Sequence, residues 1–112
     1  MNTIAIDFVR VSGLGSAALH AYATERLAAA LDQHAPRVEC AAMKFTDING
    51  PRGGAGTLCQ ARIRFRGGPP LYIEQTGADA YALAARVARR VKQAAGRALG
   101  RLLEPRRAAR RI

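Results

Sequence analysis

The chain has 112 residues, of which 49% are hydrophobic, and its formal net charge is +10. This length fits one domain with a core of its own. No segment is long and apolar enough to span a bilayer. The N-terminal apolar stretch contains Asp7 and Arg10 and lacks the layout of a secretory signal. We therefore expect a cytoplasmic protein, and the two cysteines, Cys40 and Cys59, fit a reducing compartment.

The excess positive charge is concentrated at the C-terminal end. Residues 1–85 hold eight Lys or Arg against seven Asp or Glu, whereas residues 86–112 hold ten against one. A helix face that serves solubility alone usually mixes the two signs. We therefore favour nucleic-acid binding over a merely solvated face with a disordered basic tail. An anionic membrane surface is the lesser alternative, because no Trp or Phe in this segment could insert into it.

The first predicted elements are a strand and a helix. Thr3–Val9 is rich in β-branched residues and predicts a strand, which Ser12, Gly13 and Gly15 should break. Ser16 is then a plausible N-cap. Apolar residues recur after it at steps of three and four, which indicates a helix that Pro36 should end. The apolar face of this helix comprises Leu19, Tyr22, Ala23, Leu27, Ala30 and Leu31.

Three strands follow, over Val38–Ile48, Thr57–Arg66 and Leu71–Thr76. In the middle strand apolar and polar residues alternate, which is typical of a strand with one buried face. The expected inward residues are Cys59, Ala61, Ile63 and Phe65, and the expected outward residues are Gln60, Arg62, Arg64 and Arg66. The same alternation points Cys40 and Cys59 to opposite faces, so we expect no disulfide between them.

A long second helix should begin near Asp79, whose carboxylate in the first turn favours the helix dipole. Its expected core stripe is Ala80, Ala84, Val87, Val91, Ala95, Ala98 and Leu102. At about 100° per residue, the opposite side carries Arg86, Arg90, Arg97 and Arg101, with Arg89 close by. Pro105 should stop the helix.

The resulting order, β-α-β-β-β-α, predicts an α+β fold with a four-stranded mixed sheet. A right-handed crossover makes the first two strands parallel. The next two links are short enough for antiparallel hairpins. Both helices would cover one face of the sheet, and the outward arginines of the third strand would lie on the other. We expect one domain over residues 1–104 and a basic tail over residues 105–112.

The loop between the second and third strands has the most distinctive sequence. It contains Asp47-Ile48-Asn49-Gly50 and Gly53-Gly54, and the next strand reads Cys59-Gln60-Ala61-Arg62. The final helix opens with Ala78-Asp79-Ala80-Tyr81-Ala82. Together with the element order and the basic last helix, over residues 3–103, these motifs resemble the ribosome hibernation promoting factor family, also called ribosome-associated inhibitors.

The resemblance implies an activity. Family members bind the small ribosomal subunit in the channel of messenger and transfer RNA, block translation and preserve idle ribosomes under stress. It implies small-subunit 16S rRNA as the partner of a short-form member that is monomeric off the ribosome. No catalysis, cofactor, metal, membrane or small-molecule substrate is needed. Departing from many relatives, the first helix carries only Arg26 as a basic residue, which leaves open whether it touches RNA.

Arginine suits this role because its planar fork bonds phosphate bidentately and stacks on bases. Arg52, in the glycine-rich loop, is read equally well as a solvated loop tip or as a probe that enters an RNA groove. The candidate RNA-binding residues are Arg52, Arg62, Arg64, Arg66, Arg86, Arg89, Arg90, Lys92, Arg97 and Arg101.

Two other classes of function remain as alternatives. A generic RNA- or DNA-binding module would act away from the ribosome and bind naked duplex as well as small subunits. A small enzyme with a basic surface would need a deep pocket lined by His20, His34 or a cysteine. The sequence disfavours the enzyme, because no Cys or carboxylate pattern accompanies the histidines and the glycine-rich loop lacks the Lys-Ser/Thr of a Walker motif.

Overall fold

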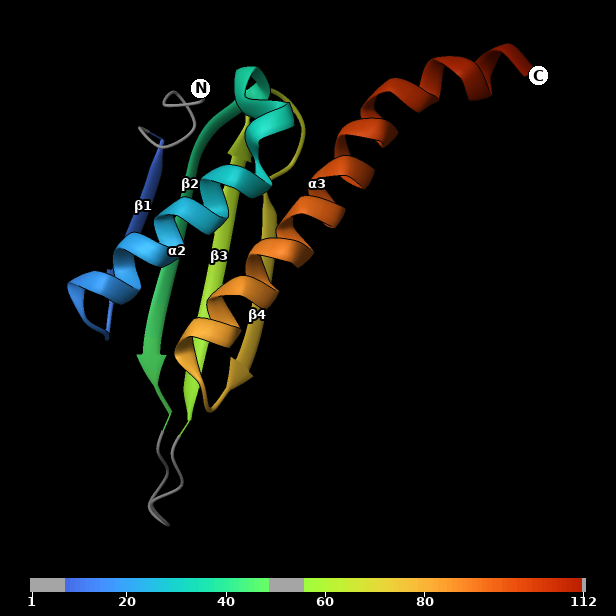
Figure 1. Cartoon of the computed structure of the whole chain (residues 1–112). Coiled ribbons are helices and arrows are strands. Elements are labelled where there is room, and N and C mark those ends of the chain that lie inside the picture. Colours follow the sequence, from blue (N-terminus) through green and yellow to red (C-terminus); the bar gives the residue numbers. More distant parts are fainter. Residues whose placement is uncertain (1–7, 49–55, 112) are drawn as a thin grey trace.

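The computed structural model describes residues 8–48 and 56–111, with side chains up to residue 100. Four strands and two α-helices follow in the predicted order, with a short 3₁₀ helix, η1, before the second strand (Figure 1). Their bounds are β1 Val9–Gly13, α2 Ala17–Ala30, η1 Asp32–Arg37, β2 Val38–Asp47, β3 Thr57–Phe65, β4 Leu71–Gly77 and α3 Ala80–Arg111.

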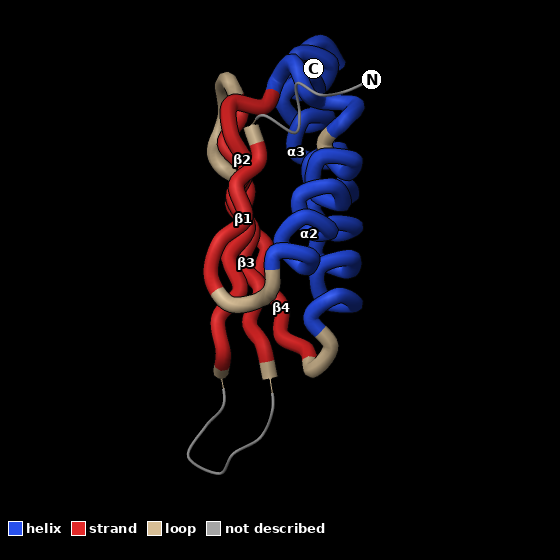
Figure 2. Tube along the Cα trace, turned by 60° about the vertical axis from the view of Figure 1, so that its left-hand side comes forward, coloured by secondary structure: helices blue, strands red, loops and turns tan. Residues whose placement is uncertain are grey.

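The sheet has the strand order β1-β2-β3-β4. β1 runs parallel to β2, and the other two pairs are antiparallel. Figure 2 shows that the sheet forms one layer and that α2 and α3 form a second layer on one of its faces. The predicted α+β architecture, with a mixed sheet covered on one side, is therefore confirmed.

The first strand differs from its prediction. β1 begins at Val9 and continues to Gly13, while most of the predicted strand Thr3–Val9 lies outside the described residues. Gly13 does not break the strand: it pairs with Phe45 and has a φ of +91°. A Cβ built there would overlap the Phe45 carbonyl oxygen. Glycine is thus needed where the two backbones approach most closely.

The first helix begins as predicted but ends early. Leu19 N donates to the Ser16 hydroxyl at 3.1 Å, which confirms the N-cap. The α-helix ends at Ala30, and Pro36 lies inside η1, so the prediction that Pro36 ends it is wrong. The α-helix gives way to the 3₁₀ helix at Asp32, four residues before the proline, and the 3₁₀ helix continues past the proline to Arg37.

The three later strands match their predicted bounds to within one residue. Along β3, the inward set predicted from the alternation is buried, as are the inward residues of β2. The register shifts between Val38 and Cys40, which marks a bulge. Glu39 and Cys40 are both exposed there, so the bulge restores the alternation that buries Ala41.

The second helix, α3, is capped by Asp79. The backbone N–H groups of Tyr81 and Ala82 donate to its Oδ1 at 3.0 and 3.3 Å. Asp79 was predicted to lie in the first turn of the helix, but it is the N-cap residue that precedes that turn. The predicted core residues Ala84, Val87, Val91 and Ala95 are buried, and Ala80 and Ala98 are half-buried. The buried face is wider than predicted, since it also includes Leu83, Ala88, Ala94 and Leu99.

Pro105 does not end α3, which continues to Arg111. A proline inside a helix removes one backbone hydrogen bond and bends the helix without necessarily stopping it. Figure 1 shows the last turns leading away from the sheet. The division into a domain of residues 1–104 and a tail of residues 105–112 stays a prediction.

The core lies between the sheet and the two helices and, among the described residues, contains no buried polar or charged residue. Its largest fully buried side chains include Phe45, Leu27 and Leu31. Cys59 belongs to this core, and burial raises the pKa of its thiol to about 12. The other cysteine, Cys40, is exposed. The two thiols thus lie on opposite faces of the sheet, as the alternation predicted.

Candidate nucleic-acid interface

A groove runs between the two α-helices on the outer surface of the helix layer. One part, of about 320 Å³, is lined by Arg26 and two alanines of α2 and by Ala88, Arg89 and Lys92 of α3. A second part, of about 560 Å³, is lined by the same Arg89 and Lys92 together with Gln33, His34, Gln93, Gly96 and Arg97. Because the two parts share two residues, we treat them as one feature, the interhelical groove.

The floor of the interhelical groove is made of small residues. Ala29 and Ala30 of α2 face Ala88 of α3 across it. Such residues let the backbone of a ligand come close, while the longer cationic side chains rise on both sides. The alanine-rich composition of the first helix thus acquires a structural role, because bulky side chains here would fill the groove.

The cations of the interhelical groove are not neutralised within the described part of the chain. Between described side chains the structure contains one ion pair, from Arg64 Nε to Glu39 Oε1 at 3.8 Å, and it lies on the other layer. Arg89, Lys92 and Arg97 are all exposed. Four cationic side chains, counting Arg26, therefore surround the groove without a carboxylate at ion-pair distance, which makes it suited to a polyanion.

An aromatic pair lies beside this groove at the start of α3. The rings of Tyr22 and Tyr81 have centroids 5.2 Å apart and are tilted by 56°. The guanidinium carbon of Arg26 lies 6.0 Å from the centroid of the Tyr22 ring. The Tyr22 ring can therefore attract the Arg26 guanidinium weakly, as a cation over an aromatic face.

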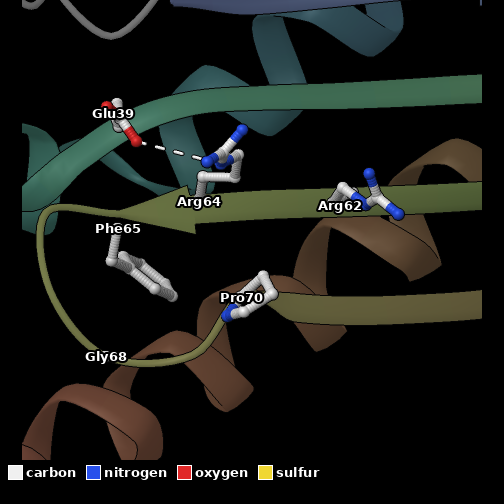
Figure 3. Close-up of a pocket in the computed structure, with 6 residues that line it drawn as sticks. All are labelled: Glu39, Arg62, Arg64, Phe65, Gly68 and Pro70. Carbon is white, nitrogen blue, oxygen red and sulfur yellow. Dashed lines mark ion pairs between the residues drawn. The ribbon is translucent and has the colours of Figure 1, made fainter.

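The second basic surface is the side of the sheet away from the helices, which we call the open sheet face. Its residues are Arg10, Ser12, Cys40, Ala42, Lys44, Thr46, Leu58, Gln60, Arg62, Arg64, Tyr72, Glu74 and Thr76, by strand register. Figure 3 shows Arg62 and Arg64 neighbouring each other along β3, with Glu39 of β2 paired to Arg64. The hollow drawn there has a volume of about 300 Å³.

The structure separates the predicted site residues onto these two surfaces. Arg89, Lys92 and Arg97 come together in the interhelical groove. Arg62 and Arg64 come together on the open sheet face. Arg90 is exposed but does not line the groove. Arg52 lies outside the described residues, and the side chain of Arg101 does too.

Two predicted residues lie elsewhere. Arg66 follows β3; its Nε donates to the Pro36 carbonyl at 3.1 Å, and its backbone N–H donates to Arg37 at 2.8 Å. These bonds tie the turn after β3 to the end of η1. Arg66 is thus held at the end of the sheet and does not join Arg62 and Arg64 on the open sheet face.

Arg86 is not on the exposed side of α3, and that prediction is wrong. The residue is half-buried, and its Nε atom is buried without a hydrogen-bond partner. Its Nη2 atom lies 3.0 Å from where a Cβ on Gly77 would be. The missing side chain at Gly77 leaves room for the guanidinium to fold back over the end of β4. A helical projection could not show this, because it contains no neighbouring strand.

Several residues of the two surfaces were not among the predicted site residues. In the groove these are Arg26 and His34, and on the open sheet face they are Arg10, Lys44 and Tyr72. Strand alternation does turn Lys44 and Tyr72 outward. Only the register, which places Ala42 opposite Arg62 and Arg62 opposite Tyr72, brings them together.

The histidines and cysteines do not form a common site. His20 Nε2 lies 3.1 Å from the Leu14 carbonyl oxygen, and its ring stacks on Phe45 with centroids 6.3 Å apart. His34 lines the basic groove. Among the described residues no group of three or more His, Cys, Asp or Glu could hold a metal ion. No helix in that part of the chain is long and apolar enough to cross a membrane.

The solved structures that are similar to this chain include a ribosomal subunit interface protein and a Protein Y domain. A ribosomal subunit interface protein from Coxiella burnetii has a TM-score of 0.61 and 15% sequence identity, covering 76% of this chain and 89% of that chain. The N-terminal domain of Thermus thermophilus Protein Y has a TM-score of 0.62 and 16% identity, covering 80% of this chain and 94% of that one. No protein-family model and no curated protein sequence matches the chain.

At these identities the likeness establishes a shared fold. It confirms, at that level, the resemblance drawn from the loop and helix motifs, since the TM-scores of 0.61 and 0.62 show that both neighbours share the fold of this chain. The two neighbours cover 76% and 80% of this chain, so the likeness extends over most of its length. The interhelical groove therefore lies on a fold that a ribosomal subunit interface protein also has.

Proposed function

We propose that this chain is a cytoplasmic, ribosome-associated translation inhibitor of the hibernation promoting factor type. In this proposal it binds small-subunit ribosomal RNA through the interhelical groove and blocks the channel of messenger and transfer RNA under stress. The observation that carries the proposal is the set of un-neutralised cations around the groove, on a fold shared with a ribosomal subunit interface protein.

The chemistry needs binding and exclusion only. A-form RNA presents phosphates and 2′-hydroxyls more readily than base edges, so a groove with cations on both walls can track its backbone. Arg26 and Arg89 stand on opposite walls of the interhelical groove, and Arg97 extends it along α3. A bound domain of this kind inhibits by occupying space that messenger or transfer RNA would need.

The test is co-sedimentation with purified small subunits at low salt. The wild-type chain should pellet with them. The variant Arg89→Glu/Lys92→Glu/Arg97→Glu should bind at least about 100-fold more weakly, because each charge-assisted contact is worth on the order of 1 kcal/mol or more. A matched variant, Lys44→Glu/Arg62→Glu/Arg64→Glu, makes the same change in charge on the open sheet face and should weaken binding less than the groove variant does.

Each arm has a contrary outcome. If the wild-type chain stays in the supernatant, it does not bind small subunits and the ribosomal proposal is refuted. Equal affinity for a naked RNA duplex and for small subunits favours the generic nucleic-acid module. If the two triple variants lose binding equally, the affinity depends on net charge and not on the groove. Thermal unfolding of each variant shows that the loss is not a loss of fold.

Blocking of the channel needs its own measurement. Saturating chain should stop translation of a reporter messenger in a purified translation system. Prior occupation of small subunits by messenger and transfer RNA should slow its binding. Full translation by subunits shown to carry the bound chain would leave ribosome association standing and reject the inhibitory role.

A further inference from the structure

Tyr72 is the exposed aromatic residue of the open sheet face. It lies on β4 and is 51% exposed, more than any other large hydrophobic residue in the described part of the chain. Gln60 Nε2 donates to its hydroxyl at 2.7 Å, and the hydroxyl donates to Glu74 Oε1 at 2.6 Å. The hydrogen bond to Glu74 raises the pKa of the Tyr72 phenol above its ordinary value. The ring is thus fixed at its polar end while much of the side chain remains open to solvent.

The surface around Tyr72 is hollowed and flanked by cations. A shallow hollow of about 520 Å³ reaches from β1 to β4 and includes Ser12, Ala42, Lys44, Gln60, Arg62 and Tyr72 in its lining. One cross-strand row runs Arg10–Ala42–Arg62–Tyr72, and the next runs Ser12–Lys44–Gln60–Glu74. Strands lie about 4.8 Å apart, so each row spans roughly 14 Å. The short side chain at Ala42 leaves the surface low between two arginines.

The charges of this face favour an anion. In the described part of the chain, Arg10, Lys44 and Arg62 have no carboxylate at ion-pair distance. The two acids nearby are already engaged, since Glu74 accepts from Tyr72 and Glu39 lies against Arg64. The ligand should therefore combine negative charge with a flat surface that can stack on an exposed ring.

We propose that the open sheet face binds unpaired RNA nucleotides, with one base stacked on Tyr72 and the adjoining phosphates held by Lys44 and Arg62. This inference rests on the proposed function in one respect, namely that the partner is RNA. A duplex does not fit the description, because its bases are already stacked within it. Single-stranded segments offer free base faces, and stacking of such bases on aromatic side chains is the usual way they are recognised.

The experiment measures binding of a fluorescein-labelled eight-nucleotide oligoadenylate by anisotropy. Tyr72→Ala should weaken binding by about 5- to 100-fold, the range expected for loss of one stacked base. Tyr72→Phe should stay within about twofold of wild type, because it keeps the ring and removes only the hydroxyl. Tyr81→Ala is the matched control: Tyr81 is 42% exposed but belongs to the helix layer, so its loss should leave the affinity nearly unchanged.

Tyrosine emission gives an independent readout. The chain has three tyrosines and no tryptophan, so its intrinsic fluorescence comes from tyrosine alone. The unlabelled oligonucleotide should quench this emission in wild type and in Tyr81→Ala. The quenching should be largely absent in Tyr72→Ala.

The outcomes separate this inference from the proposed function. A Tyr72→Ala variant with wild-type affinity for the oligonucleotide overturns the stacking site, even when small subunits still bind. Equal losses in Tyr72→Phe and Tyr72→Ala also overturn it, because the hydroxyl network would then be responsible. Conversely, a chain that fails to bind small subunits but binds the oligonucleotide through Tyr72 refutes the ribosomal proposal and leaves the stacking site standing.

Discussion

The interhelical groove and the open sheet face are both basic, but they are built differently. In the groove the cations come from elements packed side by side, and the floor is made of alanine and glycine. On the open sheet face cations alternate with acids and uncharged residues, and an exposed aromatic ring lies among them. The first arrangement suits a continuous phosphate backbone, whereas the second suits a nucleotide whose base is free. Two basic surfaces of one domain can therefore serve two kinds of contact.

The largest expected difference is in the salt dependence of binding. Each neutralised phosphate lowers the slope of log K against log salt by roughly 0.7 to 0.9. Arg89→Gln/Lys92→Gln/Arg97→Gln should therefore make the slope for a ribosomal RNA duplex shallower by about 2 to 3. Lys44→Gln/Arg62→Gln/Arg64→Gln should change the duplex slope by less than about 1. The slopes are measured by titration at several potassium chloride concentrations.

An identical change of slope in these two glutamine variants would break the comparison between the two surfaces. It would mean that the duplex responds to the field of the whole chain and does not recognise the groove.

A second prediction concerns Gly13, at the end of the strand that brings Arg10 to the open sheet face. Gly13→Ala should lower the free energy of unfolding by more than about 2 kcal/mol, because it adds both an unfavourable backbone conformation and an overlap with Phe45. Gly67→Ala is the control, since Gly67 has a φ of +112° but open space around it. Its cost should be about 1 kcal/mol.

Urea unfolding measures both glycine variants. Equal costs would show that the overlap at Phe45 is relieved by a shift of β1. A more costly Gly67→Ala would contradict the role given to Gly13.

A smaller effect is expected at Arg86, which sharpens the boundary of the groove. Arg86→Met should leave the free energy of unfolding within about 1 kcal/mol of wild type, because it removes a buried nitrogen without a partner and keeps most of the packing. RNA affinity should change less than in Arg89→Met, the matched substitution in the groove. A larger loss of affinity in Arg86→Met would place Arg86 back on the binding surface.

The smallest expected effect tests the two faces of the sheet through their thiols. A disulfide reagent should label Cys40 quickly in the folded protein and Cys59 only as the protein opens. The Cys59 phase should stay slow between pH 7 and 9, because burial raises the pKa of its thiol from 9.0 to about 12. Cys40→Ser should remove the fast phase, and two equally fast phases would contradict the burial of Cys59.

Much of the fold could be predicted because most helices and strands have one buried face and one solvent-exposed face. The period-2 alternation in β3 and the apolar stripe in α3 each identify a buried face without any knowledge of neighbours. The predictions of local structure that were wrong concern residues whose conformation depends on another part of the fold. Gly13 was predicted to break a strand because its pairing with Phe45 is invisible in the sequence. Pro36 was expected to end the first helix, but that α-helix ends at Ala30 and a 3₁₀ helix follows it.

The candidate surfaces were predictable only in part, for the same reason. The charge excess after residue 85 pointed to α3, and the structure brings Arg89 and Lys92 together there. The opposite wall, with Arg26, depends on how the helices pack, which no periodicity specifies. Arg86 was misplaced because the space beside Gly77 exists only in the assembled domain.

The parallel pairing of β1 also bears on the order in which the domain folds. Val9 pairs with Ala41, 32 residues further along the chain, whereas β3 and β4 form a hairpin from neighbouring segments. Long-range pairings cost more loop-closure entropy before they contribute stability. β1 should therefore join the sheet after β3 and β4 have paired and, as an edge strand, be the first strand whose amides exchange with solvent. Arg10 would then reach the open sheet face only after pairing of the later strands has brought Arg62 and Tyr72 together there.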